Sequence, residues 1–93
     1  MPPQLFQIMY LEIITPDKKA FEGEVTGVKL PGTTGFFEIL NNHAPIISTL
    51  KRGDIQIRIA GQNTDTFVKV EGGIVEMLNN KVVVLAEAVI EEV

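Results

Sequence analysis

The strongest constraint on this chain is an alternation of apolar and polar residues with a period of two, broken at short intervals by turn residues. In residues 54–59 isoleucine takes every second position, and the residues between are polar. Such alternation is typical of a strand with one buried face and one solvated face, as in an antiparallel sheet. Residues 9–13 carry a similar stripe, and residues 82–86 are apolar throughout, which predicts an interior strand.

Turn residues divide the chain into many short segments. Gly, Asn and Asp tolerate a positive φ, and Pro presets φ, so their clusters mark turns. Asn79 and Asn80 stand between two apolar runs and predict a tight hairpin. The alternation slips by one near Gly27, which predicts a bulge there. Because no stretch of about eleven residues shows helical periodicity, the sequence predicts an all-β fold, either a sandwich or a small barrel.

Composition limits the class of protein. The 93 residues predict a single domain, 1–93, in which residues 1–8 form a loose arm or extend the first strand. The formal net charge of −4 weighs against nucleic acid and anionic lipid as partners. The absence of cysteine excludes disulfides and thiolate chemistry. No apolar run approaches the ~18 residues of a spanning helix, and no signal-peptide pattern is found, so we expect a bacterial cytoplasmic protein.

The sequence offers little for catalysis. His43 is the one histidine, and its neighbours Asn42 and Ala44 supply neither a nucleophile nor a second base, so we expect an interface or structural residue. The glutamates are scattered, which predicts solvated strand faces and strand ends rather than an acid–base pair. Gly72 and Gly73 lack the lysine of a phosphate loop and instead predict a close backbone approach or a bend. We therefore expect no catalytic residue, no cofactor and no metal site.

Two consecutive aromatic residues, Phe36 and Phe37, should point to opposite faces of a strand. Phe37 shares a face with Ile39, whereas Phe36 shares a face with Glu38. This pairing predicts that Phe37 enters the core and that Phe36 stands outward, as an anchor for a partner or as edge packing.

Several short motifs occur in a fixed order between residues 10 and 90. In chain order they are Leu11-Glu12-Ile13-Ile14-Thr15-Pro16, Phe21-Glu22-Gly23, His43-Ala44-Pro45, Val70-Glu71-Gly72-Gly73-Ile74-Val75-Glu76 and Val82-Val83-Val84-Leu85-Ala86. Their order and spacing resemble the epsilon subunit of the rotary F-type ATP synthase. After Gly35 the family often has Glu, then an apolar residue, then Gly, whereas this chain has Phe36, Phe37 and Glu38. A proline is common in the family where this chain has Asn41.

The resemblance implies a flattened antiparallel β-sandwich of about ten short strands that performs no chemistry. It implies a rotor component of the central stalk, linking the gamma shaft to the c-ring and coupling ion flow to ATP synthesis. The place implied is the cytoplasmic face of the bacterial inner membrane, reached only through the complex. By position, the residues implied to meet gamma are Thr15, His43 and Ser48. Those implied to meet the c-ring are Gly32, Thr33, Thr34, Gly35, Phe36, Asn41 and Asn42.

The segment after the last motif sets a further expectation. Residues 87–93 are too short for an autonomous helix in water, so we expect a short epsilon chain without the inhibitory C-terminal helical hairpin of the family. The alternative is a small non-catalytic ligand-binding β-sandwich module, which should contain an apolar cavity of roughly 300–1,000 Å³.

Overall fold

The computed structural model describes residues 8–90, which form eight β-strands and no helix. The strands are β1 (Met9–Ile14), β2 (Lys19–Gly32), β3 (Gly35–Leu40), β4 (Ile46–Leu50), β5 (Gly53–Ile59), β6 (Asp65–Val70), β7 (Gly73–Leu78) and β8 (Lys81–Ala86). The all-β prediction is confirmed, with eight strands in place of about ten. No helix among these residues could span a bilayer. The expected arm of residues 1–8 lies, apart from Ile8, outside the described residues.

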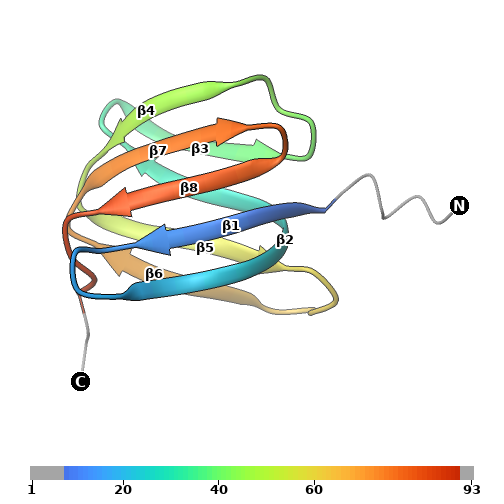
Figure 1. Cartoon of the computed structure of the whole chain (residues 1–93), viewed down its shortest axis with the longest axis horizontal. Helices are drawn as coiled ribbons and strands as arrows, with labels where there is room; N and C mark the ends of the chain where they lie inside the picture. Colours follow the sequence, from blue (N-terminus) through green and yellow to red (C-terminus); the bar gives the residue numbers. More distant parts are fainter. Residues whose placement is uncertain (1–7, 91–93) are drawn as a thin grey trace, which may run out of the picture.

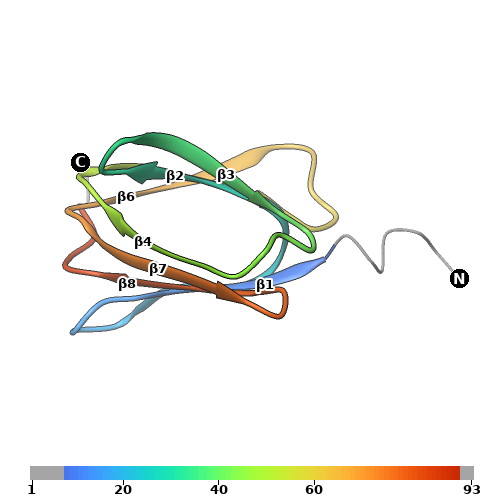
Figure 2. The ribbon, with the colours of Figure 1, turned by 90° about the horizontal axis from the view of Figure 1, so that it is seen from above.

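The strands form two layers that share one long strand. Figure 2 shows β1, β8, β7 and β4 in one layer and β2, β3 and β6 in the other. The hydrogen-bonded order is β1-β8-β7-β4-β2-β5-β6, with β3 added to β2 and with β1 also paired to β2. The sandwich is elongated along the strands, as Figure 1 shows.

Strand β2 joins the two layers because it bends. Its first half pairs with β1, from Ile14↔Lys19 to Met9↔Val25, and its second half pairs with β3 and β5. The β2–β5 register shifts between Val25 and Gly27. The bulge predicted near Gly27 is thus present, and such a bulge bends a strand and increases its twist.

The core lies between the layers and follows the alternation. Ile55 and Ile57 of β5 are fully buried, and Ile59 is half-buried, as the pattern of residues 54–59 predicts. On β8 every second residue is buried, while Leu85 on the other face is 55% exposed. Strand β8 does lie between β1 and β7, as predicted for an interior strand, yet only one of its faces is covered by the described residues.

One strand pair differs from the predicted antiparallel sandwich. Strands β1 and β8 run parallel, with Tyr10 opposite Lys81 and Ile14 opposite Leu85. The short connection from β7 to β8 is the predicted hairpin, in which Asn79 and Asn80 have φ angles of 53° and 60°. Positive φ at both central residues is typical of a type I′ turn, which suits the twist of the flanking strands.

The two ends of the sandwich carry different connections. At the end we call the hairpin end lie the β3–β4 loop (residues 41–45) and the β7–β8 hairpin (Figure 1). At the opposite end, the turn end, lie residues 15–18, 33–34 and 51–52 (Figure 1).

The segment that follows β8 returns along the outer edge of β6. Val89 forms an antiparallel bridge with Val70, and the Ile90 N–H donates to the Lys69 carbonyl at 2.8 Å. The Glu71 N–H donates to the Ala88 carbonyl at 3.0 Å. These bonds cover part of an edge strand that would otherwise offer unpaired backbone groups. Residues 91–93 lie outside the described part.

Gly73 at the start of β7 supports a sharp prediction about stability. Its φ is 153°, and a Cβ there would lie 2.2 Å from the Leu85 carbonyl oxygen. Gly73→Ala should therefore lower the free energy of unfolding by about 3 kcal/mol, measured by urea denaturation. Gly61→Ala is the matched control, because Gly61 also has a positive φ (82°) but nothing lies within 4 Å of its Cβ position.

The control should cost about 1 kcal/mol, since only the backbone conformation opposes alanine there. Equal urea midpoints for the two variants would show that the close approach of β7 to β8 does not limit this position.

Candidate interaction surfaces

The outer face of the β4-β7-β8-β1 layer carries exposed apolar side chains. Ile47 is 72% exposed, Leu85 55% and Ile74 46%. The register places them together, because Ile74 lies opposite Leu85, and Leu85 lies opposite Ile14. We call this surface the apolar face and define it as Ile14, Ile47, Ile74, Val83 and Leu85. An exposed apolar patch of contiguous residues typically marks a protein–protein contact.

A network of ion pairs borders the apolar face on β1, β2 and β8. Glu12 receives Lys19 Nζ at 3.0 Å and Lys81 Nζ at 3.1 Å, and Lys19 also contacts Glu22 at 3.0 Å. The Tyr10 hydroxyl donates a hydrogen bond to Glu22. Since Glu12 lies opposite Val83, the network meets the apolar face directly.

The network shifts the titration of its members. Hydrogen bonds from Lys19 and then Lys81 hold the pKa of Glu12 below its ordinary value of 4.5. A hydrogen bond from the Tyr10 hydroxyl, and a weaker effect of the hydrogen bond from Lys19, lower the pKa of Glu22. The same contacts raise the pKa of Lys19, chiefly through Glu12, and that of Tyr10, chiefly through Glu22.

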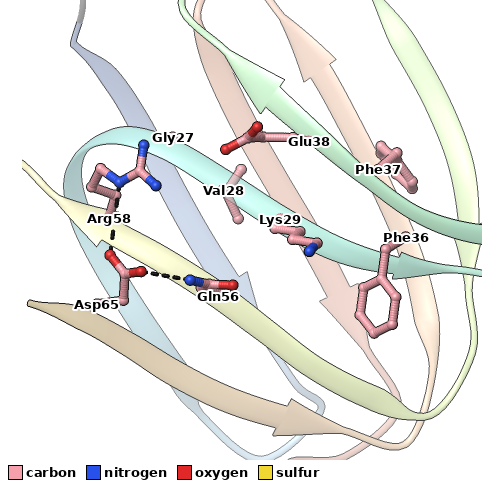
Figure 3. A pocket seen from close by; sticks show the side chains of 9 residues that line it. All are labelled: Gly27, Val28, Lys29, Phe36, Phe37, Glu38, Gln56, Arg58 and Asp65. Carbon is pink, nitrogen blue, oxygen red and sulfur yellow. Dashed lines mark hydrogen bonds and ion pairs between the residues drawn. The ribbon is translucent and has the colours of Figure 1, made fainter.

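The outer face of the other layer is polar between two aromatic side chains. Phe36 on β3 and Phe67 on β6 are each 58% exposed. A hollow of about 190 Å³ is lined by both rings. A larger hollow of about 350 Å³, lined by Phe36 but not by Phe67, contains the Arg58–Asp65 ion pair at 3.7 Å. Figure 3 shows Phe36 at one end of this hollow and the Arg58–Asp65 pair at the other.

The prediction for the two phenylalanines is confirmed, because Phe36 stands outward while Phe37 packs against the core. The Nζ of Lys29 lies 5.4 Å from the centre of the Phe36 ring, a cation–π distance. The Lys29 contact holds the Phe36 ring to β2 without burying it.

The residues implied to meet gamma do not form one cluster. Thr15 lies at the turn end. Its hydroxyl donates a hydrogen bond to the Lys18 carbonyl at 3.0 Å and accepts one from the Lys18 N–H at 3.1 Å. His43 lies in the β3–β4 loop at the hairpin end, exposed, with Nδ1 2.7 Å from the Ala44 carbonyl. Ser48 lies midway along β4 and is half-buried. The three side chains thus span the length of the sandwich.

The residues implied to meet the c-ring also divide between the two ends. Gly32, Thr33, Thr34 and Gly35 form the β2–β3 turn at the turn end, and Phe36 follows at the start of β3. Asn41 and Asn42 lie at the hairpin end, past the end of β3. At about 3.3 Å per residue, the strand between the two groups separates them by roughly 20 Å. The two groups therefore share a strand, β3, but not an end.

Asn80, which the sequence predicted only as a turn residue, connects the β7–β8 hairpin to the β3–β4 loop through its side chain. Asn80 Oδ1 accepts a hydrogen bond from the Asn42 N–H at 2.8 Å. Asn80 Nδ2 donates to Asn41 Oδ1 at 2.9 Å and to Asn42 Oδ1 at 3.3 Å. The asparagines lie almost forty residues apart in the sequence, so neither spacing nor periodicity could reveal these bonds.

Together these features define a class of protein. Within residues 8–90 no group of His, Asp and Glu side chains is placed to hold a metal ion. What the described surface does offer is an exposed apolar face, an outward phenylalanine and hydrogen-bonded loops. The fold and the surfaces are those of a β-sandwich suited to contact with other proteins.

Comparison with known proteins gives the family. Residues 8–92 match the family described as ATP synthase, Delta/Epsilon chain, beta-sandwich domain. The ATP synthase epsilon chain of Chlorobium limicola is 42% identical over 79 residues, which cover 85% of this chain and 89% of that protein. The chain therefore belongs to the ATP synthase delta/epsilon family and is a non-catalytic subunit.

Other relatives differ in length or are more distant. The epsilon chain of Herminiimonas arsenicoxydans is 42% identical over 82 residues, which cover 88% of this chain but only 59% of that protein. The mitochondrial ATP synthase of Euglena gracilis contains a chain that superposes with a TM-score of 0.83 at 14% identity, over 90% of this chain and 53% of that one. A chain in the central stalk and c-ring structure of the mitochondrial ATP synthase from Tetrahymena thermophila superposes with a TM-score of 0.74 at 17% identity. The superposition covers 89% of this chain and 66% of that one. These structural likenesses establish the fold.

The lowered pKa of Glu12 predicts how stability depends on pH. A carboxylate whose pKa falls on folding stabilises the protein above its unfolded pKa, near 4.5, and this stabilisation is lost as the pH falls through the lower, folded pKa. We expect the thermal midpoint of the native chain to drop below about pH 4.5. Glu12→Gln should lower the midpoint at pH 7 and make the decline below pH 4.5 shallower.

Glu76→Gln is the control, because Glu76 lies on the same outer face and makes no ion pair among the described residues. Its pH profile should follow that of the native chain. Parallel profiles for Glu12→Gln and the native chain would show that the network does not contribute to acid sensitivity.

Proposed function

We propose that this chain holds the gamma shaft of an F-type ATP synthase against the c-ring, so that ion-driven rotation of the ring reaches the catalytic head. The observation that carries the proposal is the apolar face on a rigid sandwich of this family. A coupling element must resist deformation, and hydrogen-bonded strands packed around one core meet that need. The complex would bring the chain to the cytoplasmic face of the bacterial inner membrane.

The apolar face is the surface we assign to gamma. Its side chains stand on four neighbouring strands, so their relative positions are fixed by the sheet rather than by loops. A rotor contact that bears load needs a broad, well-packed apolar centre with a polar rim. The Glu12–Lys19–Lys81 network supplies charged groups along one border of such a centre. Of the three residues implied to meet gamma, only Thr15 borders this face, beside Ile14 and Leu85. Ser48 alternates with the outward Ile47 on β4 and stands on the other face of that strand, and His43 lies in the β3–β4 loop.

The edge formed by β3 is the surface we assign to the c-ring. This strand pairs only with β2 among the described residues, so its other edge faces outward. Its two ends carry the β2–β3 turn with Phe36 and the β3–β4 loop with Asn41 and Asn42. A contact along β3 would engage both groups at once, although they lie at opposite ends of the sandwich.

The alternative of a small ligand-binding module has less support. A hollow of about 370 Å³ at the hairpin end is lined by asparagine, histidine and proline side chains and opens to solvent. A hollow of about 420 Å³ beside Thr15 and Leu85 also opens to solvent. Small-molecule sites generally bury most of their ligand inside an apolar cavity.

The assembly proposal is tested directly by co-purification with the cognate gamma subunit at high salt. An interface of at least about 1,200 Å² with an apolar centre should survive salt that screens surface charges. Failure of the purified native chain to retain gamma would refute the proposal.

The assignment of the apolar face to gamma predicts the effect of Leu85→Ser. Leu85 is 55% exposed, so the fold should persist, while gamma should bind roughly tenfold more weakly because an apolar contact is lost. Phe67→Ser is the matched control, since Phe67 is equally accessible but lies on the opposite outer face. Calorimetric titration with gamma measures both. If the Leu85→Ser and Phe67→Ser variants bind gamma with equal affinity, the apolar face is not part of the gamma interface.

The assignment of the β3 edge to the c-ring predicts the effect of Phe36→Ala. Because Phe36 is 58% exposed, its loss should leave the thermal midpoint nearly unchanged. Binding of the gamma complex to c-ring vesicles should weaken roughly fivefold. Phe37→Ala should instead lower the thermal midpoint, because Phe37 packs against the core. Unfolding of the Phe36→Ala variant would contradict the outward role of this ring.

A further inference from the structure

The hairpin end contains a set of side-chain hydrogen bonds that the proposed contacts alone do not explain. The Asn80 amide binds the Asn42 N–H and both Oδ1 atoms of Asn41 and Asn42, at 2.8 to 3.3 Å. In addition, the Asn80 carbonyl accepts a hydrogen bond from the Tyr10 N–H at 3.0 Å. Asn80 therefore ties together the start of β1, the β7–β8 hairpin and the β3–β4 loop.

The loop has few other internal bonds that fix its position. The His43 N–H donates to the Leu40 carbonyl at 3.1 Å, which closes a local turn. Asn42 has a φ of 64°, a left-handed conformation that costs energy unless surrounding contacts hold it. The bond from the Asn42 N–H to Asn80 Oδ1 is such a contact.

The direction of the bonds leaves particular groups for a partner. Asn80 uses both its Oδ1 and its Nδ2 within the chain. Asn41 and Asn42 accept through Oδ1, so their Nδ2 groups stay available as donors. The hollow beside them, about 370 Å³, is lined by Asn42, His43, Pro45, Asn79 and Asn80, with no carboxylate or ammonium group.

We propose that Asn80 is a positioning residue for ring contact, and that the β7–β8 hairpin and the β3–β4 loop form one docking surface for a polar loop of the c-ring. The inference rests on the proposed function and adds the hairpin to the contact. Asn80 acts through Asn41 and Asn42, which present their amide groups to backbone and side-chain acceptors of the partner.

The position of Asn80 offers a matched pair of variants. Asn79 and Asn80 have similar φ angles, 53° and 60°, which glycine adopts readily. Asn80→Gly therefore keeps the type I′ turn and removes the three side-chain bonds. Asn79→Gly keeps the turn as well, and the Asn79 side chain makes no hydrogen bond among the described residues. Any difference between the two variants reports on the Asn80 amide.

The experiment measures three quantities on each full-length variant bound to gamma. They are the affinity for gamma, the binding of the complex to vesicles that contain the c-ring, and the amide hydrogen exchange of Asn42. For Asn80→Gly we expect unchanged gamma affinity, roughly tenfold weaker ring binding and at least about tenfold faster exchange at Asn42. For Asn79→Gly we expect native values of all three.

A third variant separates the individual bonds. Asn80→Asp keeps an acceptor for the Asn42 N–H and loses the donor to Asn41 and Asn42. It should keep slow exchange at Asn42 and show ring binding between that of the native chain and that of Asn80→Gly.

The outcomes distinguish this inference from the proposed function. Equal ring binding by Asn80→Gly and Asn79→Gly, with native ring binding intact, would overturn the inference alone. Equal loss of gamma and ring binding by Asn80→Gly would also overturn it, because a purely structural role would then suffice. Native chain that binds neither gamma nor ring would overturn the proposed function and the ring contact together, while hydrogen exchange would still decide whether Asn80 positions the loop.

Discussion

The bend in β2 is the constraint on which the rest of this sandwich depends. One strand of fourteen residues pairs with β1 in its first half and with β3 and β5 in its second half. The register shift between Val25 and Gly27 turns it from one layer to the other. Because both layers share this strand, their spacing and relative angle are set by backbone hydrogen bonds as well as by the core. A shared strand makes the two outer faces parts of one stiff body, which suits an element that transmits torque.

Strand β3 is attached across the sandwich at both of its ends. At the turn end, the Thr33 N–H donates to the Thr49 carbonyl at 3.2 Å, and the two threonine hydroxyls lie 3.0 Å apart. At the hairpin end, Asn80 holds the loop that follows β3. Strand β4, which carries Thr49, and the β7–β8 hairpin both belong to the layer with the apolar face. The proposed ring edge is therefore fixed to the proposed gamma face by hydrogen bonds at each end.

Local pattern in the sequence predicted much of the fold. Alternation identified Ile55 and Ile57 as core, and the slip near Gly27 identified the bulge. What the pattern could not show was long-range pairing: the parallel β1–β8 contact joins residues about seventy positions apart, and periodicity carries no partner information. For the candidate surfaces, the outward direction of Phe36 was predictable from Glu38, whereas the Asn80 bonds depend on a turn meeting a distant loop.

The apolar run of residues 82–86 shows why a surface of this kind escapes sequence reasoning. Apolar residues on both faces of a strand indicate that both faces are covered, and Val84 and Leu85 are equally apolar. The structure buries Val84 and leaves Leu85 55% exposed. If gamma covers the apolar face, the apolar residues on both faces of β8 are explained, because the second face is buried by another chain rather than by this one. An interior strand that is bare on one face is then itself an argument for a permanent partner rather than a passing one.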